Sequence, residues 1–224
     1  MTATVSGDIV EYSLGPGVAC MAEWSRAQDA MGAVVLFHDE GEDLDALRPV
    51  SRPLHTLRLD ALLVDLPGHG LSGGSWDEHG CQAVGLAIAH CASQVKPPPA
   101  VVAHGRATNL VLAQTDAAIS ALVTIGPRLS ESELGPESPW RHVPMLAVAD
   151  PTDAEAQQSR RLIQRWLRAW YLQLNLHYTK ARRHDPADWP LQVPTASAAF
   201  AAEQIAYRMP ARDRQVPSAP RAPR

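Results

Sequence analysis

The feature of this sequence that most constrains its fold is a series of short segments that are apolar at nearly every position. Five of them occur along the chain: AVVLF (33–37), ALLVDL (61–66), VVA (101–103), ALVTI (121–125) and PMLAVA (144–149). Unbroken apolar runs of this length are typical of strands covered on both faces, which is the arrangement of a parallel sheet. The sequence therefore predicts an α/β fold with a mostly parallel, doubly wound sheet and helices on both faces.

The segments between these runs carry turn and helix signals. They predict a hairpin over 8–24 around SLGPGV, a helix within SWDEHGCQAVGLAIAHCASQV (75–95), and helices over about 106–118, 152–181 and 196–208. Capping boxes mark two of the helix starts, Ser75 with Glu78 and Thr152 with Glu155. In the longest helix an apolar stripe recurs at four-residue spacing, formed by Leu162, Trp166, Trp170 and Leu174. Such a stripe predicts core packing or an interface.

Length and charge limit the organisation of the chain. A chain of 224 residues fits one domain, predicted over residues 1–209, followed by a Pro/Arg-rich tail over 210–224 that we expect to be disordered. Residues 1–100 carry 5 Lys/Arg against 13 Asp/Glu, and residues 151–224 carry 12 against 6. A solvated basic face explains the second excess better than an anionic partner does. No basic patch interleaved with aromatic residues indicates nucleic-acid binding.

Three features of the sequence indicate the cellular compartment of the protein. No run reaches the ~18 apolar residues of a membrane helix. The first residues, MTATVSGDIVEYS, lack the basic segment followed by an apolar run that a signal peptide has. The three cysteines, Cys20, Cys81 and Cys91, form neither a metal motif nor an even disulfide set. These observations predict a cytoplasmic protein with reduced thiols, no membrane contact, no metal and no cofactor.

One loop carries a resemblance to a known family. The segment DLPGHGLSGG (65–74) resembles the D-x-P-G-x-G-x-S loop of the α/β-hydrolase superfamily. Three weaker matches follow the same order: FHDEG (37–41) with the oxyanion loop, PMLAVADPTD (144–153) with the strand before the acid, and WPLQVP (189–194) with the stretch around the histidine. Together they span about residues 30–208. The resemblance implies the α/β-hydrolase fold.

The nucleophile position departs from that family. The strand–turn–helix segment AVVAHGRATNLVLA (100–113) stands where the family has G-x-S-x-G, and its five elbow positions are Ala103, His104, Gly105, Arg106 and Ala107. Small residues at the flanks preserve the turn. A glycine has no side chain to acylate, so the usual covalent mechanism is excluded at Gly105. The resemblance therefore implies a degenerate member that lacks the serine nucleophile.

The other two triad positions are only partly matched. Asp153 falls where the family places its acid, although its place in the first turn of a helix also explains an acidic residue there. Alignment on WP at 189–190 puts Asp188 at the histidine position, and His184 lies four residues earlier. Either residue is a candidate, because geometry decides which group acts as a base.

Five residues are candidates for binding a ligand: His38, Asp39, His104, Gly105 and Arg106. Asp39 replaces the glycine of the oxyanion loop, and a carboxylate there repels a developing negative charge. The acidic loop is either solvated or the mouth of a pocket for a cation or a neutral ligand. The N–H groups that follow Gly105, with Arg106 beside them, suit a carboxylate or a phosphate.

The connection between residues 125 and 144 is short. Many relatives insert a helical cap at this point, whereas about 18 residues leave room only for a loop. We therefore expect no cap or a minimal one, and a shallow, open pocket.

Three functions fit these features. The first is a pseudoenzyme that binds a small molecule or another protein, as a homo-oligomer or with a partner enzyme. The second is an atypical enzyme (a lyase, isomerase or hydrolase) that acts on a small organic substrate by non-covalent acid/base chemistry through His38, His104 or His184. The third is an esterase whose nucleophile is Ser72 or Cys81.

Overall fold

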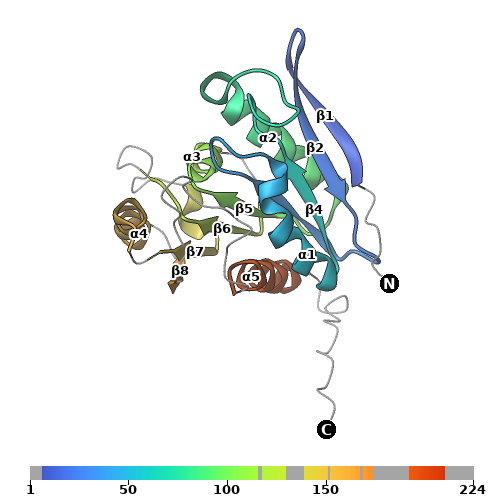
Figure 1. Cartoon of the computed structure of the whole chain (residues 1–224). Helices are drawn as coiled ribbons and strands as arrows, with labels where there is room; N and C mark the ends of the chain where they lie inside the picture. The colour runs from blue at the N-terminus through green and yellow to red at the C-terminus, as the bar shows by residue number, and fades with distance from the viewer. Residues whose placement is uncertain are drawn as a thin grey trace.

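The chain is built around an eight-stranded sheet with the strand order β1-β2-β4-β3-β5-β6-β7-β8 (Figure 1). The computed structural model describes residues 7–115, 118–129, 139–150, 152–166, 169–173 and 192–209. The strands are β1 (Gly7–Gly15), β2 (Val18–Ser25), β3 (Gly32–Phe37), β4 (Leu59–Val64), β5 (Ala100–His104), β6 (Ala121–Ile125), β7 (Met145–Ala149) and β8 (Ala169–Gln173). Strands β1 and β2 form the predicted antiparallel hairpin, and β2 pairs antiparallel with β4. Strands β3 through β8 run parallel to one another.

Helices cover both faces of the sheet, as the sequence predicts (Figure 1). They are α1 (Arg48–Thr56), α2 (Trp76–Gln94), α3 (Ala107–Leu112), α4 (Ala154–Trp166) and α5 (Gln192–Arg208), with two short 3₁₀ helices, η1 (Leu44–Leu47) and η2 (Pro139–His142). One apolar core lies between the sheet and α2, α3 and α4, and a second lies between the sheet and α1 and α5. Every residue of β3 through β7 is buried, which explains why apolar residues dominate these strands.

The predicted long helix over 152–181 is wrong. Helix α4 ends at Trp166, and residues 169–173 form β8, which pairs parallel with β7. Trp170 therefore lies in a strand, and Leu174 lies outside the described residues, so the predicted stripe is not a face of one helix. The segment AWYLQ is rich in aromatic residues that favour strands, and the free edge of β7 provides a partner that outweighs the four-residue spacing.

Neither predicted capping box makes its side-chain hydrogen bond. Ser75 makes no side-chain hydrogen bond at the start of α2. At the start of α4 the cap is Asp153, whose Oδ1 accepts the N–H of Glu155 at 2.9 Å, while the Thr152 hydroxyl donates to Asp150 at 2.7 Å. Helix α3 also ends earlier than predicted, at Leu112.

The connection between β6 and β7 contains no large cap in its described residues, 126–129 and 139–144. Its helix η2 packs onto the body of the fold, because the buried indole of Trp140 donates a hydrogen bond to the carbonyl of Leu112 at 2.8 Å. The predicted tail over 210–224 lies outside the described residues. Among the helices that are described, none combines the length and apolar character needed to cross a membrane.

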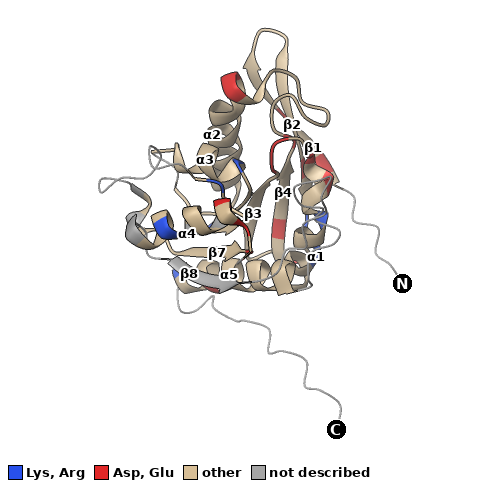
Figure 2. Ribbon diagram, turned by 60° about the vertical axis from the view of Figure 1, so that its left-hand side comes forward, with Lys and Arg blue, Asp and Glu red and all other residues tan. Residues whose placement is uncertain are grey.

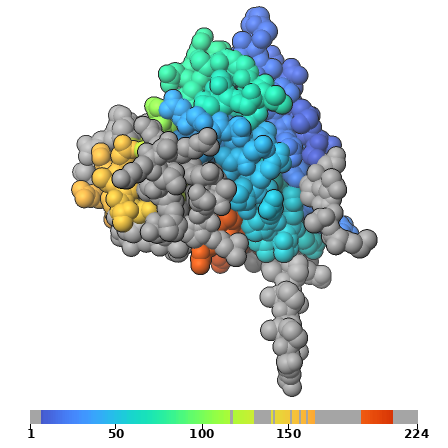
Figure 3. Space-filling view, in the orientation of Figure 1, coloured from blue at the N-terminus to red at the C-terminus, as the bar shows by residue number. Residues whose placement is uncertain are grey.

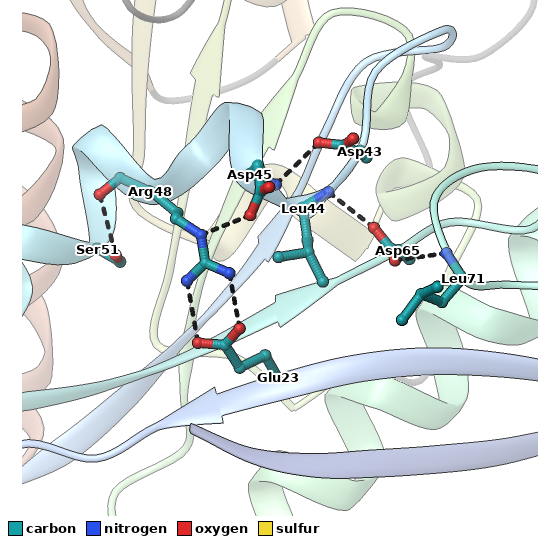
Figure 4. Close-up of polar contacts among 8 residues, drawn as sticks. All are labelled: Glu23, Asp43, Leu44, Asp45, Arg48, Ser51, Asp65 and Leu71. Carbon is teal, nitrogen blue, oxygen red and sulfur yellow. Dashed lines mark hydrogen bonds and ion pairs between the residues drawn. The ribbon is translucent and has the colours of Figure 1, made fainter. Parts of the chain in front are cut away.

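The DLPGHGLSGG loop is a structural clamp. The buried carboxylate of Asp65 accepts the N–H of Leu44 at 2.8 Å and the N–H of Leu71 at 2.9 Å (Figure 4). The Ser72 hydroxyl donates to the Asp65 carbonyl at 2.6 Å. A Cβ at Gly70, where φ is +52°, would lie 2.1 Å from Asp65 Oδ2, so this position requires glycine. The clamp therefore joins the loop after β4 to the segment before α1.

A second anchor holds the other side of that segment. The Arg48 guanidinium donates to both carboxylate oxygens of Glu23 on β2, at 3.0 and 2.7 Å, and to Asp45 at 2.5 Å (Figure 4). A bidentate pair of this kind fixes orientation as well as distance. The light-blue segment that leads into α1 lies at the surface in the space-filling view (Figure 3). Its position thus depends on these polar anchors as well as on burial of Leu47.

We predict that Asp65→Asn lowers the free energy of unfolding by about 1–3 kcal/mol, because the buried side chain keeps only one oxygen to accept the main-chain N–H groups of Leu44 and Leu71. The matched control is Asp45→Asn, whose side chain is 68% exposed in the same network and whose effect we expect within about 0.5 kcal/mol. Urea denaturation measures both. Equal losses for the two variants would show that Asp65 is not a clamp.

Candidate functional site

The candidate site lies at the carboxyl ends of the parallel strands. Strand β3 leads into His38 and Asp39, and its neighbour β5 leads into Gly105 and Arg106. Phe37 of β3 pairs with Ala103 of β5, so the two loops leave the sheet side by side. Ligands bind at this edge in open α/β sheets, where neighbouring connections diverge.

The predicted strand–turn–helix at residues 100–113 is present. Strand β5 ends at His104, Gly105 turns the chain with φ of +55°, and α3 begins at Ala107. The N–H of Gly105 donates to the carbonyl of Ile125 at 2.9 Å, which ties the turn to β6. The tight elbow is therefore retained, and glycine adopts its left-handed conformation without steric cost.

The carboxylate of Asp39 fills the space at the tip of this elbow. A Cβ built on Gly105 would lie 2.1 Å from both Cγ and Oδ2 of Asp39 and 2.3 Å from Oδ1. These distances are far below van der Waals contact. Asp39 is only 3% exposed, so its carboxylate is enclosed where a side chain at position 105 would stand.

Main-chain donors hold this carboxylate. Asp39 Oδ1 accepts the N–H of Arg106 at 2.7 Å and the N–H of Glu40 at 2.8 Å. The N–H of Asp39 itself donates to Glu42 Oε2 at 3.1 Å. In the α/β-hydrolase architecture, an oxyanion hole uses the N–H after the nucleophile and an N–H from the loop after β3. The equivalent donors here, on Arg106 and Asp39, both face carboxylates of this chain.

A buried histidine–carboxylate pair lies beneath the elbow. His104 Nδ1 is 2.9 Å from Glu42 Oε2, with the histidine side chain fully buried and the glutamate 17% exposed. Burial raises the pKa of Glu42, but the hydrogen bond and charge of His104 and the N–H of Asp39 outweigh it, so the pKa is lowered. Glu42 is thus held ionised against His104. The sequence offered no signal for this pairing.

Arg106 and His38 also have partners within the chain. The Arg106 guanidinium pairs with Glu40, and acidic and basic segments lie next to each other beside α3 (Figure 2). His38 Nδ1 faces the carbonyl of Asp39 at 2.7 Å, and its Nε2 accepts the N–H of Leu66 at 2.9 Å. Burial lowers the pKa of His38, which keeps the ring neutral. Both ring nitrogens of His38 therefore serve the main chain rather than a ligand.

Asp153, the residue predicted for the acid position, lies after β7 and pairs with a cation that the sequence did not point to. Asp153 Oδ2 is 3.9 Å from the guanidinium of Arg128, which follows β6 and also pairs with Glu155. Its Oδ1 caps α4. The two candidate bases, His184 and Asp188, lie outside the described residues.

Neither alternative nucleophile stands at the elbow. The Ser72 hydroxyl donates to Asp65 and accepts the N–H of Met21 at 2.7 Å, so it belongs to the clamp. Cys81 lies in α2, and burial raises its pKa. In the part of the chain that the structure describes, no group of three or more His, Cys, Asp or Glu side chains is arranged to hold a metal ion.

The lowered pKa of Glu42 predicts a pH-dependent contribution to stability. A group whose folded-state pKa is lowered stabilises the protein above its unfolded pKa, and this stability is lost as pH falls through the folded value. We predict that Glu42→Gln lowers the free energy of unfolding by about 1–2 kcal/mol at pH 7, and that the difference from wild type shrinks below about pH 4.

Urea denaturation between pH 7 and pH 3.5 measures this dependence. The control is Glu78→Gln, whose side chain is 76% exposed at the start of α2. A difference between Glu42→Gln and wild type that stays constant over this range would show that the His104 contact does not depend on the ionised carboxylate.

Comparisons with known proteins identify the architecture. No family model matches the chain, and no curated protein matches it. Among solved structures, a CIB-like hydrolase from Thermoplasma acidophilum superposes with a TM-score of 0.66 at 10% identity, covering 89% of this chain and 99% of its own. A serine hydrolase homologue from Coxiella burnetii gives 0.65 at 12% identity, covering 91% and 100%. The esterase domain of a Rhodothermus marinus protein gives 0.63 at 18% identity, covering 88% and 98%. The chain therefore has the α/β-hydrolase fold.

Proposed function

We propose that this protein does not acylate substrates through a serine, and that it binds a small molecule or another protein on an α/β-hydrolase scaffold. The observation that carries the proposal is the Asp39 carboxylate at the tip of the elbow, beside a glycine in place of a nucleophile. Acyl transfer requires an attacking atom and N–H donors aimed at the developing oxyanion. Gly105 has no side chain that could supply the attacking atom.

The electrostatics of the elbow support the same proposal. The N–H groups of Arg106 and Asp39 already have carboxylate acceptors, from Asp39 and Glu42 respectively. A tetrahedral intermediate would have to displace these acceptors and develop negative charge beside them. In a buried site such repulsion is strong, since little water screens it. The acidic mouth favours a ligand that is cationic or neutral.

The hydrolase and esterase descriptions of the structural neighbours are an argument for catalysis. They do not decide the matter, because one fold supports many functions. A specific observation favours a second candidate, an atypical enzyme that uses acid/base chemistry without a covalent intermediate. The pair of His104 with Glu42, 2.9 Å apart, is a geometry in which a carboxylate orients an imidazole. Turnover of a small organic substrate that is lost in His104→Gln would favour this candidate.

An oligomeric role has less support than the sequence suggested. The tryptophan stripe that favoured an interface is divided between α4 and β8. A homo-oligomer or a complex with a partner enzyme is therefore proposed only from the missing nucleophile. Size-exclusion chromatography with light scattering tests for the homo-oligomer, and a monomer at high concentration would argue against it. A cytoplasmic location without membrane or nucleic-acid contact likewise stays a prediction.

We predict that a fluorophosphonate probe does not label the wild-type protein and that p-nitrophenyl acetate is hydrolysed at the background rate. We expect the same for Gly105→Ser combined with Asp188→His, because Asp39 still occupies the space of the new serine. An active serine hydrolase serves as the positive control. Labelling of the wild type would refute the proposal. Esterase activity in the double variant would contradict the claim that Asp39 blocks the elbow.

A further inference from the structure

We infer that the elbow is a carboxylate-binding site which the chain fills with its own Asp39, and that Asp39 and Gly105 are interdependent. The ligand class that fits the emptied site is a small monocarboxylate, with formate as the simplest. This inference concerns the same site as the proposed function but does not rest on it, because it is about what occupies the elbow and not about what the protein binds or converts.

The overlap between the two positions is the first step. The Asp39 carboxyl group and a Cβ at position 105 cannot exist together, since the built Cβ lies 2.1 Å from Cγ and Oδ2 of Asp39. Both residues closely follow paired strands, because the last four residues of β3 pair with residues 100–103 of β5 and the two strands end at the same edge. The bare α-carbon of Gly105 is therefore a steric requirement of Asp39.

The donors that meet the carboxylate are the second step. Two main-chain N–H groups, from Arg106 and Glu40, converge on Asp39 Oδ1 at 2.7 and 2.8 Å. Hydrogen bonds to an ionised acceptor are stronger than neutral ones. With Asp39 only 3% exposed, removal of its carboxylate would leave these donors in a pocket of matching shape. A free carboxylate restores both bonds.

The third step is that the loop which carries Asp39 is held on several sides. Glu42 of this loop pairs with His104 of β5, and Glu40 pairs with the Arg106 guanidinium. The N–H of Gly41 donates to His69 Nε2 at 2.8 Å, which ties the loop to the clamp after β4. The position of Asp39 is thus fixed by its whole loop, and the carboxylate behaves as a tethered ligand.

The chain provides a matched control for the glycine. Gly41 lies in the same loop and also has a positive φ, +86°, but a Cβ there would meet nothing within 4 Å. Gly41→Ala therefore reports the cost of a left-handed alanine alone. Any additional loss in Gly105→Ala reports the collision with Asp39.

The first test is a double-mutant cycle followed by thermal denaturation. We expect Gly105→Ala to lower Tm by ~5 °C or more beyond the effect of Gly41→Ala, on the scale of 2–4 °C per kcal/mol for a chain of this size. In an Asp39→Ala background we expect alanine at 105 to cost no more than Gly41→Ala does. Equal effects of Gly105→Ala and Gly41→Ala, or the same cost in both backgrounds, would overturn the interdependence.

The second test supplies the missing carboxylate. We expect sodium formate to raise the Tm of Asp39→Ala saturably, beyond the effect of sodium chloride at equal ionic strength, because it binds the folded state. The wild type and Asp45→Ala, an exposed acid nearby, should gain no more from formate than from chloride. If Asp39→Ala folds only with formate, the inference is supported. No gain over the controls, or no folding in either salt, would overturn it.

These readouts separate the inference from the proposed function. The cycle and the formate titration measure stability, whereas probe labelling and ester hydrolysis measure acylation. A wild-type protein that hydrolyses esters but shows the expected coupling would refute the proposed function and leave the inference standing. A wild-type protein that is not labelled and shows no coupling would refute the inference and leave the proposed function standing.

Discussion

The contact between the Asp39 carboxylate and the main-chain N–H of Arg106 is the interaction on which the candidate site depends. The N–H that follows a tight strand-to-helix turn needs an acceptor when it is buried, because an unsatisfied donor is costly. In a serine hydrolase that donor serves substrate oxygen only during the reaction. Here Asp39 satisfies it permanently, and the missing side chain of Gly105 leaves the room to do so.

The geometry of this contact is fixed because the neighbouring loops are anchored by hydrogen bonds outside the site. Asp65 holds the segment before α1 by the N–H of Leu44, and Arg48 holds it against Glu23 of β2 (Figure 4). The sequence motif that resembles the hydrolases most closely thus has a structural task in this chain, since its aspartate and its serine are used in main-chain hydrogen bonds. That task is independent of a nucleophile.

The sheet could be predicted from the sequence because five of its strands are buried on both faces, and such strands have a continuous apolar signature. The elbow was predicted from its place between a strand and a helix. β8 was predicted as helix, because AWYLQ carries apolar residues that also fit helical spacing and only pairing with β7 decides its state. The Asp39–Gly105 overlap had no local signal, since the two residues lie 66 positions apart in the sequence and the register of β3 against β5 brings them together.

A glycine at the tip of the elbow need not weaken a fold of this kind, because other residues specify the fold. The sheet is stabilised by buried strands, and the loops by Asp65 and Arg48, none of which would attack a substrate. The backbone strain that an elbow serine must bear, at φ of +55°, disappears with glycine. The Asp39 carboxylate then satisfies the main-chain donor that follows the turn. Glycine at position 105 and a carboxylate at position 39 are compatible with each other. Together they explain how the elbow keeps its backbone conformation while the neighbouring loop occupies its tip.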